Sequence, residues 1–220
     1  MVDSPMRELV VCTARGAGDP PFALPGLVPV VDRCEAEGVV VDLPHGDPGA
    51  RVRFGRRRPV DAVVWCTPGA SLPAGLADRY DEWFRLRCTA HVGWRPALSD
   101  EPDPRDVVKQ VSFLVAADGY GEERFRAHYR QHVDVARRHM PALWQYVQND
   151  VVDVSDGTEG AAGIVAVSEL WFGSTDDFLH RYFPSEEDAE QLRAHEDFLD
   201  LTRASSFIAT SHVAAPGARA

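Results

Sequence analysis

Apolar residues in the second half of the chain follow strand and helix spacings that can be read segment by segment. Val107 to Ala116 and Gly163 to Phe172 are rich in β-branched and apolar residues and predict strands. Glu122 to Tyr146 has apolar residues at helical spacing and predicts a helix between them. A short strand is expected near Val147 to Val154.

Two further helices and a closing strand are predicted downstream. Ser174 is a candidate N-cap, with Asp177 three residues later, and starts the first of these helices. Ser185 to Asp200 opens with acidic residues, which suit a helix N-terminus, and predicts the second helical segment. Ser206 to Val213 predicts the last strand. The second half therefore reads as β-α-β-β-α-β.

The first half repeats this order more faintly. It predicts strands at Glu8 to Ala14, Val39 to Leu43, Asp61 to Thr67 and Arg85 to Val92, with helices at Leu27 to Glu37 and Leu76 to Phe84. The two closing strands are also alike, Cys-Thr-Ala-His-Val ending at Val92 and Ala-Thr-Ser-His-Val ending at Val213. These patterns predict an α+β protein built from two tandem ferredoxin-like (βαββαβ) units, related by a diverged duplication.

A proline-broken acidic segment separates the two halves. Ser99 to Arg105 has no apolar periodicity and is typical of a linker. We therefore expect a degenerate ferredoxin-like domain at 1–98, a linker at 99–106 and a second ferredoxin-like domain at 107–220.

Composition and charge narrow the class of protein. The chain of 220 residues is 45% apolar and 26% charged, as in ordinary globular proteins. A net charge of −11 disfavours nucleic acid and anionic membranes as partners. No apolar run approaches the roughly 18 residues of a membrane span, and no signal-peptide pattern begins the chain. We expect a soluble, cytoplasmic protein whose partner is a small molecule.

The sequence carries no signature of a bound cofactor. Its four cysteines form no C-x-x-C pair, so neither a zinc knuckle nor a redox dithiol is indicated. Buried core positions are expected for Cys12, Cys66 and Cys88, which lie in apolar runs. Gly119-Tyr120-Gly121 lacks the third glycine of a nucleotide-binding loop. Lys109 is the single lysine, and nothing around it suggests Schiff-base chemistry. We therefore expect no cofactor.

Histidines lie on the apolar face of the long predicted helix. The stripe that should face the sheet contains Phe125, Tyr129, His132, Ala136, His139, Met140 and Leu143, with His128 at its edge. A buried imidazole must find hydrogen-bond partners, so His132 is either a core histidine satisfied by its surroundings or a proton-transfer residue. His128 and His132 also have the i, i+4 spacing of metal ligands, but no third ligand is evident and no metal is expected.

These motifs resemble the EthD family of the dimeric α/β-barrel superfamily. The resemblance rests on Phe125-x-x-His128-Tyr129-x-x-His132, Met140-Pro141-Ala142-Leu143, Tyr146-Val147-Gln148-Asn149, the segment Ser168 to Phe178, and Phe198-Leu199-Asp200. It covers about half the chain, from Lys109 to Val213, and the first half lacks the motifs. It implies an intrachain pseudo-dimeric α/β barrel, as a monomer or a homodimer.

The resemblance also implies a site and a range of functions. His132 takes the position of the family's helix histidine and is the candidate acid or base, with Tyr129 and His128 beside it. Candidate substrate-binding residues are Tyr146, Asn149, Trp144, Trp171, Phe183 and His139.

The predicted function is cofactor-independent lyase, cyclase or dehydratase chemistry on a hydrophobic oxygenated substrate, as in polyketide metabolism. The alternatives are a cofactor-free monooxygenase with the same pocket and a non-catalytic accessory protein that binds a small molecule.

Overall fold

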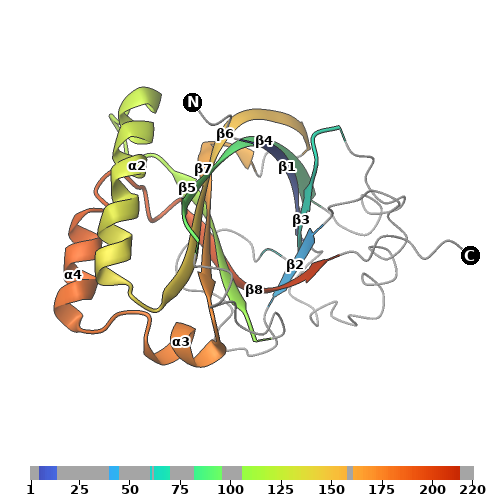
Figure 1. Ribbon diagram of the computed structural model, residues 1–220. Coiled ribbons are helices and arrows are strands. Elements are labelled where there is room, and N and C mark those ends of the chain that lie inside the picture. Colours follow the sequence, from blue (N-terminus) through green and yellow to red (C-terminus); the bar gives the residue numbers. More distant parts are fainter. Residues whose placement is uncertain are drawn as a thin grey trace, which may run out of the picture.

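A closed, antiparallel eight-stranded barrel is the central feature of the computed structural model (Figure 1). The structure describes residues 5–13, 40–44, 60, 62–69, 82–95, 106–157 and 161–213. The predicted helix at Leu27 to Glu37, most of the one at Leu76 to Phe84 and the predicted linker from Ser99 to Arg105 lie outside these residues. Among the described residues, no helix has the length and apolar character needed to cross a membrane.

Each half of the chain supplies four strands to the barrel. The first half provides β1 (Met6–Thr13), β2 (Val40–Pro44), β3 (Ala62–Cys66) and β4 (Glu82–Trp94). The second half provides β5 (Val108–Val115), β6 (Leu143–Gly157), β7 (Ile164–Phe172) and β8 (Ser205–Val213). The residues from Glu82 onward are strand, which corrects the end of the helix expected to reach Phe84.

The strand order repeats between the halves. Around the barrel, the strands run β4-β1-β3-β2 and then β8-β5-β7-β6, so each half has the same internal order. The halves meet at two antiparallel junctions, β2 with β8 and β4 with β6. The architecture is therefore mixed α+β with a sheet closed on itself, and an origin of the two halves by tandem duplication stays a prediction.

The described helices cover the outer face of the second half's sheet (Figure 1). They are α2 (Glu122–His139), α3 (Thr175–His180) and α4 (Glu186–Ala194). Acidic residues in the first turn of α2 and basic residues in its last turn complement the helix dipole. Ser174 and Ser185 accept N-cap hydrogen bonds, as the sequence predicts for Ser174.

Two helices are shorter than the sequence pattern suggests. The long helix stops at His139, and Leu143 already begins β6, although apolar spacing continues to Tyr146. Pro141 explains this end, because proline disfavours helical backbone in the residue before it, and Met140 has φ −129° and ψ 66°. The segment predicted to be helical to Asp200 ends at Ala194.

Alternate residues of β5 face two different environments. Gln110, Ser112 and Leu114 face the helices, whereas Val111 and Phe113 belong to the apolar cluster inside the barrel. Both faces are buried, so all eight residues of the strand are buried. The barrel core and the helix-covered core are thus separate layers on the two faces of one sheet.

A buried charge cluster inside the barrel joins the two halves. The Lys109 Nζ atom lies 2.6 Å from Asp42 Oδ2 on β2 and 2.8 Å from Glu169 Oε2 on β7. Arg7 on β1 contacts Glu169 Oε1 at 2.6 Å, and Trp65 Nε1 donates a hydrogen bond to Asp42 at 2.5 Å. Burial raises the pKa of Glu169, but the charges of Lys109 and Arg7 outweigh it and hold that pKa below its usual value.

Candidate active site

A small cavity lies between the helices and the outer face of the second half's sheet. Its volume is about 60 Å³. The lining residues come from β5, β6 and β7 on the sheet side and from α2, α4 and the segments around α4 on the helix side: Gln110, Ser112, Leu114, Tyr129, His132, Ala136, Met140, Tyr146, Ser168, Leu170, Tyr182, Leu192, Glu196, Phe198 and Leu199. One wall is therefore polar and the rest is largely apolar, as in small-molecule sites.

His132 projects from α2 into this layer and is 7% exposed. Burial is the main cause that lowers its pKa to about 3, and the nearby rings of His195 and His128 lower it further. The imidazole is therefore neutral at physiological pH. Its Nδ1 atom is buried and has no hydrogen-bond partner in the part of the chain that the structure describes. The fold thus leaves one hydrogen-bonding position open on this ring.

Aromatic rings pack against the outer side of His132. The ring of His195 lies 5.7 Å from that of His132 and 4.6 Å from that of His128. Phe198 stacks on His128 at 4.5 Å, and the Tyr120 hydroxyl approaches His128 Nδ1 at 3.4 Å. Within the described residues, no group of three or more His, Cys, Asp or Glu side chains has an arrangement that could hold a metal ion. The ring contacts with His195 and Phe198 hold the imidazole of His132 in place.

Hydroxyl groups from α2 and from the sheet meet at the sheet side of the cavity. The Tyr129 hydroxyl and Ser168 Oγ are 2.6 Å apart and share a hydrogen bond in which either can be the donor. Tyr146 accepts a hydrogen bond from Gln148 Nε2 at 3.3 Å. Burial raises the pKa of both tyrosines, so both stay protonated and can donate to an oxygen atom in the cavity.

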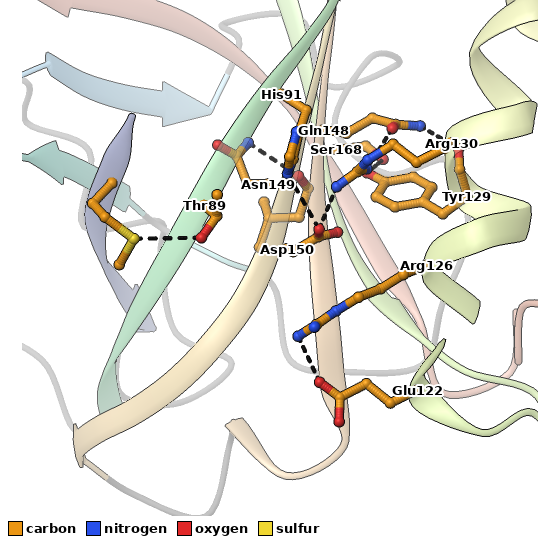
Figure 2. Close-up of polar contacts among 12 residues, drawn as sticks. Thr89, His91, Glu122, Arg126, Tyr129, Arg130, Gln148, Asn149, Asp150 and Ser168 are labelled. Atoms are coloured by element: carbon orange, nitrogen blue, oxygen red, sulfur yellow. Dashed lines mark hydrogen bonds and ion pairs between the residues drawn. The ribbon is translucent and has the colours of Figure 1, made fainter. Parts of the chain in front are cut away.

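Gln148 connects this wall to an ion pair between α2 and β6 (Figure 2). Its Nε2 atom also donates to the Tyr129 backbone carbonyl at 2.5 Å, and its Oε1 atom accepts from Arg130 at 2.6 Å. Figure 2 shows Arg130 reaching from α2 to Gln148 and to Asp150 on β6, with which it is paired. His91 of β4 lies 3.4 Å from Asp150, so the first half of the chain also contacts this network.

Glu196 is the one carboxylate among the described cavity-lining residues. It follows α4, and its carboxylate makes no hydrogen bond or ion pair with another described residue. Burial raises its pKa to about 7, and the charge of Arg193 lowers it only partly. The negative charge of the Glu196 carboxylate, like burial, raises the pKa of Tyr146. The two groups therefore lie within electrostatic reach of each other.

The structure brings three of the predicted site residues together at the cavity: Tyr129, His132 and Tyr146. His128 lies behind His132 and does not line the cavity. Asn149 faces the barrel interior, where its Nδ2 atom donates to Glu169 at 2.9 Å. Trp171 is on the same face, with Lys109 Nζ 4.5 Å from its ring centre.

The remaining predicted binding residues also lie outside the cavity. Trp144 occupies the irregular position of β6 where the register with β7 shifts. Phe183 packs on Tyr182 with ring centres 4.7 Å apart. His139 Nδ1 lies 2.9 Å from Asp188 Oδ1, which joins α2 to α4.

Sequence reasoning did not single out five polar residues of the cavity: Gln110, Ser112, Ser168, Tyr182 and Glu196. For the strand residues, a usable signal existed. Polar residues at alternate positions of β5, among apolar neighbours, indicate that one face of the strand lines a polar site. Glu196 offered no such signal, because its place depends on how the segment after α4 turns back to the sheet.

No protein-family model matches the sequence, and no curated protein matches it either, so membership of the EthD family is not confirmed. Solved structures, in contrast, match over nearly the whole chain.

Three of these structures define the fold class. A monooxygenase candidate from Lactobacillus acidophilus NCFM has 7% identity and a TM-score of 0.52, covering 97% of each chain. A second candidate, from Fusobacterium nucleatum subsp. nucleatum ATCC 25586, has 7% identity and a TM-score of 0.58 over 99% of this chain and 97% of its own. An anthrone oxidase-like protein has 12% identity and a TM-score of 0.59, over 100% and 98%. The chain therefore shares the fold of these three proteins over nearly its whole length.

Proposed function

We propose that the protein is a small-molecule oxygenase that removes a proton from an oxygenated aromatic substrate in the cavity between α2, α4 and the sheet, so that the resulting carbanion reacts with O₂. The observation that carries the proposal is the cavity itself. It combines an imidazole that has an unpaired buried nitrogen with a wall of tyrosine and serine hydroxyls. The names of the fold neighbours favour oxygenation over the lyase or cyclase chemistry that the sequence first suggested.

Each cavity group has a role in this chemistry. Tyr129 and Tyr146 are protonated and donate to the substrate oxygen, which becomes negative when the carbon beside the ring system loses its proton. His132 is neutral and offers a ring nitrogen to the same or a neighbouring polar atom. A positioned acid or base typically contributes roughly 10²–10⁴-fold to the rate.

The overall reaction balances without a further reactant. A CH₂ group loses a proton to a base, and the carbanion adds O₂ to give a peroxide anion. Return of the proton gives a hydroperoxide, which loses water to leave a ketone. One CH₂ group and one O₂ thus yield one C=O group and one H₂O, and the electrons that reduce oxygen come from the substrate.

The volume of the cavity limits the substrate. About 60 Å³ is well below the roughly 300–1,000 Å³ of sites that enclose a drug-sized molecule. A substrate with several rings therefore has to displace part of the helix-side wall, which Leu192, Glu196 and Leu199 form. A flat, narrow molecule requires the smallest displacement.

Oxygen uptake tests the proposal. Wild-type protein is given anthrone, 1,8-dihydroxyanthrone or 2-naphthol in an oxygen electrode, and the rate of spontaneous oxidation is subtracted. We expect protein-dependent uptake, with the ketone as product from the anthrones. The His132→Ala variant should lose at least about 10²-fold, because it removes a hydrogen-bonding group that stabilises the negative oxygen of the substrate. The His180→Ala variant changes an exposed histidine of α3 and should keep the wild-type rate.

Other outcomes contradict either the oxygenase or the role of His132. Conversion that proceeds equally well without O₂ indicates the lyase or cyclase chemistry instead. Binding without conversion indicates an accessory protein. Uptake that is the same in wild type and His132→Ala removes His132 from the reaction.

A further inference from the structure

The oxygenase needs a base for the first proton, and the geometry of the cavity restricts the choice. The ionisable groups that line it, within the described chain, are Tyr129, His132, Tyr146, Tyr182 and Glu196. The two buried tyrosines have raised pKa values and are donors at neutral pH, whereas the low pKa of His132 makes it a weak base. Among the described residues that line the cavity, only Glu196 carries a carboxylate.

We propose that Glu196 is the catalytic base, which takes the proton from the substrate carbon and later returns it to the peroxide anion. This assignment rests on the proposed function. In the first step of the reaction, the substrate C–H bond breaks and the O–H bond of the Glu196 carboxylic acid forms. The electron pair stays on the substrate and is delocalised onto the oxygen that the tyrosines face.

The position of Glu196 supports this role. It enters the cavity from the segment after α4, on the helix-side wall, whereas Ser112, Ser168 and Tyr146 belong to the sheet. A flat substrate between these walls can therefore present its oxygen to the hydroxyls and its carbon to the carboxylate. No described side chain occupies the carboxylate with a hydrogen bond or an ion pair, so it is available to a substrate.

The charged and titratable groups around Glu196 are consistent with a base that works near neutral pH. Arg193 on α4 lowers its pKa slightly, whereas burial raises it to about 7. Tyr146 faces it from β6, and His132 of α2 lines the same cavity. Because the pKa of His132 is about 3, it carries no positive charge that would stabilise the carboxylate at pH 7.

The pH dependence of oxygen uptake distinguishes Glu196 from His132 as the base. In wild type, kcat/KM should rise with pH and level off above a midpoint near 7, as the carboxylate forms. The Glu196→Gln variant should lose at least about 10²-fold and show no such rise. Glu196→Asp should keep a rise with a moved midpoint, and Glu190→Gln, which changes an exposed residue of α4, should behave as wild type.

A measurement without substrate accompanies these rates. Carbon-13 NMR of glutamate-labelled protein, with the Glu196 signal identified by its loss in Glu196→Gln, should show a titration midpoint near 7. A midpoint near 4.5, or an active Glu196→Gln variant with an unchanged pH profile, overturns the assignment while the oxygenase stands. If wild type consumes no oxygen with any of the three compounds, the proposed function fails, and the assignment fails with it.

Discussion

Burial moves the pKa values of two cavity side chains in opposite directions. It lowers the pKa of His132 to about 3 and raises that of Glu196 to about 7, because it disfavours the charged form of each. Near pH 6 both groups are therefore largely neutral. Both shifts also make folding stability depend on pH, with opposite signs.

The Glu196→Gln variant isolates one of these contributions. The folded protein binds the Glu196 proton more tightly than the unfolded chain, so this group lowers stability as pH rises from about 4.5 to 7 and has its full cost above pH 7. Glu196→Gln should thus be more stable than wild type at pH 8, by on the order of 3 kcal/mol, and the gain should shrink towards pH 4.5. Urea unfolding at pH 5 and pH 8 measures this difference.

His132 makes folding stability depend on pH in the opposite direction. Its folded pKa lies below the unfolded value, so its contribution to stability is lost as pH falls from 6.5 towards 3. Both the Glu196→Gln variant and wild type contain His132, so its contribution cancels in the difference between their stabilities. A gain in stability that is equal at both pH values would contradict the raised pKa of Glu196, and Glu190→Gln serves as the exposed control.

Among the individual residues of the site, those on the helix were predicted better from the sequence than those on the strands. Helical spacing placed Tyr129 and His132 on the inward face, and both line the cavity. Asn149 and Trp171 were also expected there, yet they face the barrel interior, because alternate residues of a strand point to opposite faces and both faces of this sheet are buried. Spacing within one strand cannot tell two buried faces apart.

Among the elements, the packing of α2 against the sheet decides where the cavity lies. Helix α2 also approaches β4, a strand of the other half, at Gly93. A Cβ atom at Gly93 would lie 3.0 Å and 3.2 Å from the two methyl carbons of Val133 and 3.4 Å from the Tyr146 carbonyl oxygen. A glycine at this position therefore lets the helix approach the strand closely.

The Gly93→Ala variant tests this contact. We expect a loss of about 1–3 kcal/mol in the free energy of unfolding, because the added methyl group overpacks the interface. Adding Val133→Ala should restore part of the loss, since it removes the atoms in conflict. Gly121→Ala is the matched control, because a Cβ atom there meets nothing within 4 Å. A Gly93→Ala variant as stable as wild type contradicts the close approach.

The element boundaries show what local pattern can and cannot predict. Strands β5, β7 and β8 lie close to the predicted segments, because β-branched runs between polar turns are a local signal. Strand β6 runs from Leu143 to Gly157 and is longer at both ends than the short strand predicted near Val147 to Val154. The apolar stripe predicted a helix to Tyr146, but the backbone restriction before Pro141 ends it at His139. Periodicity alone did not register that restriction, since Met140 and Leu143 stay buried after the helix ends.

For the whole molecule, the charge cluster inside the barrel ties the halves together. Lys109 is the only lysine of the chain, is 1% exposed, and pairs with Asp42 from the first half and Glu169 from the second. Its ammonium group also lies 4.5 Å from the ring centres of Trp65 and Trp171. Sequence reasoning found no role for this lysine, because its partners lie on strands far away in the chain.

Lys109→Met should therefore destabilise the whole barrel. Removing the cation that two buried carboxylates share is expected to cost about 3–5 kcal/mol. The triple variant with Asp42→Asn and Glu169→Gln should recover much of this loss, because it removes the carboxylate charges as well. Thermal unfolding of both variants gives the comparison. A single variant as stable as wild type would show that the cluster does not hold the halves together.

A crystal structure with 2-naphthol would show whether the cavity beside α2 is the active site. We expect the ring system in that cavity, where it displaces part of the helix-side wall. Its oxygen should lie within hydrogen-bond distance of Tyr146, Ser168 or His132, and Glu196 should face its edge. Binding inside the barrel, near Lys109 and the two tryptophans, would contradict this assignment. So would a cavity that stays closed while the compound binds elsewhere on the protein.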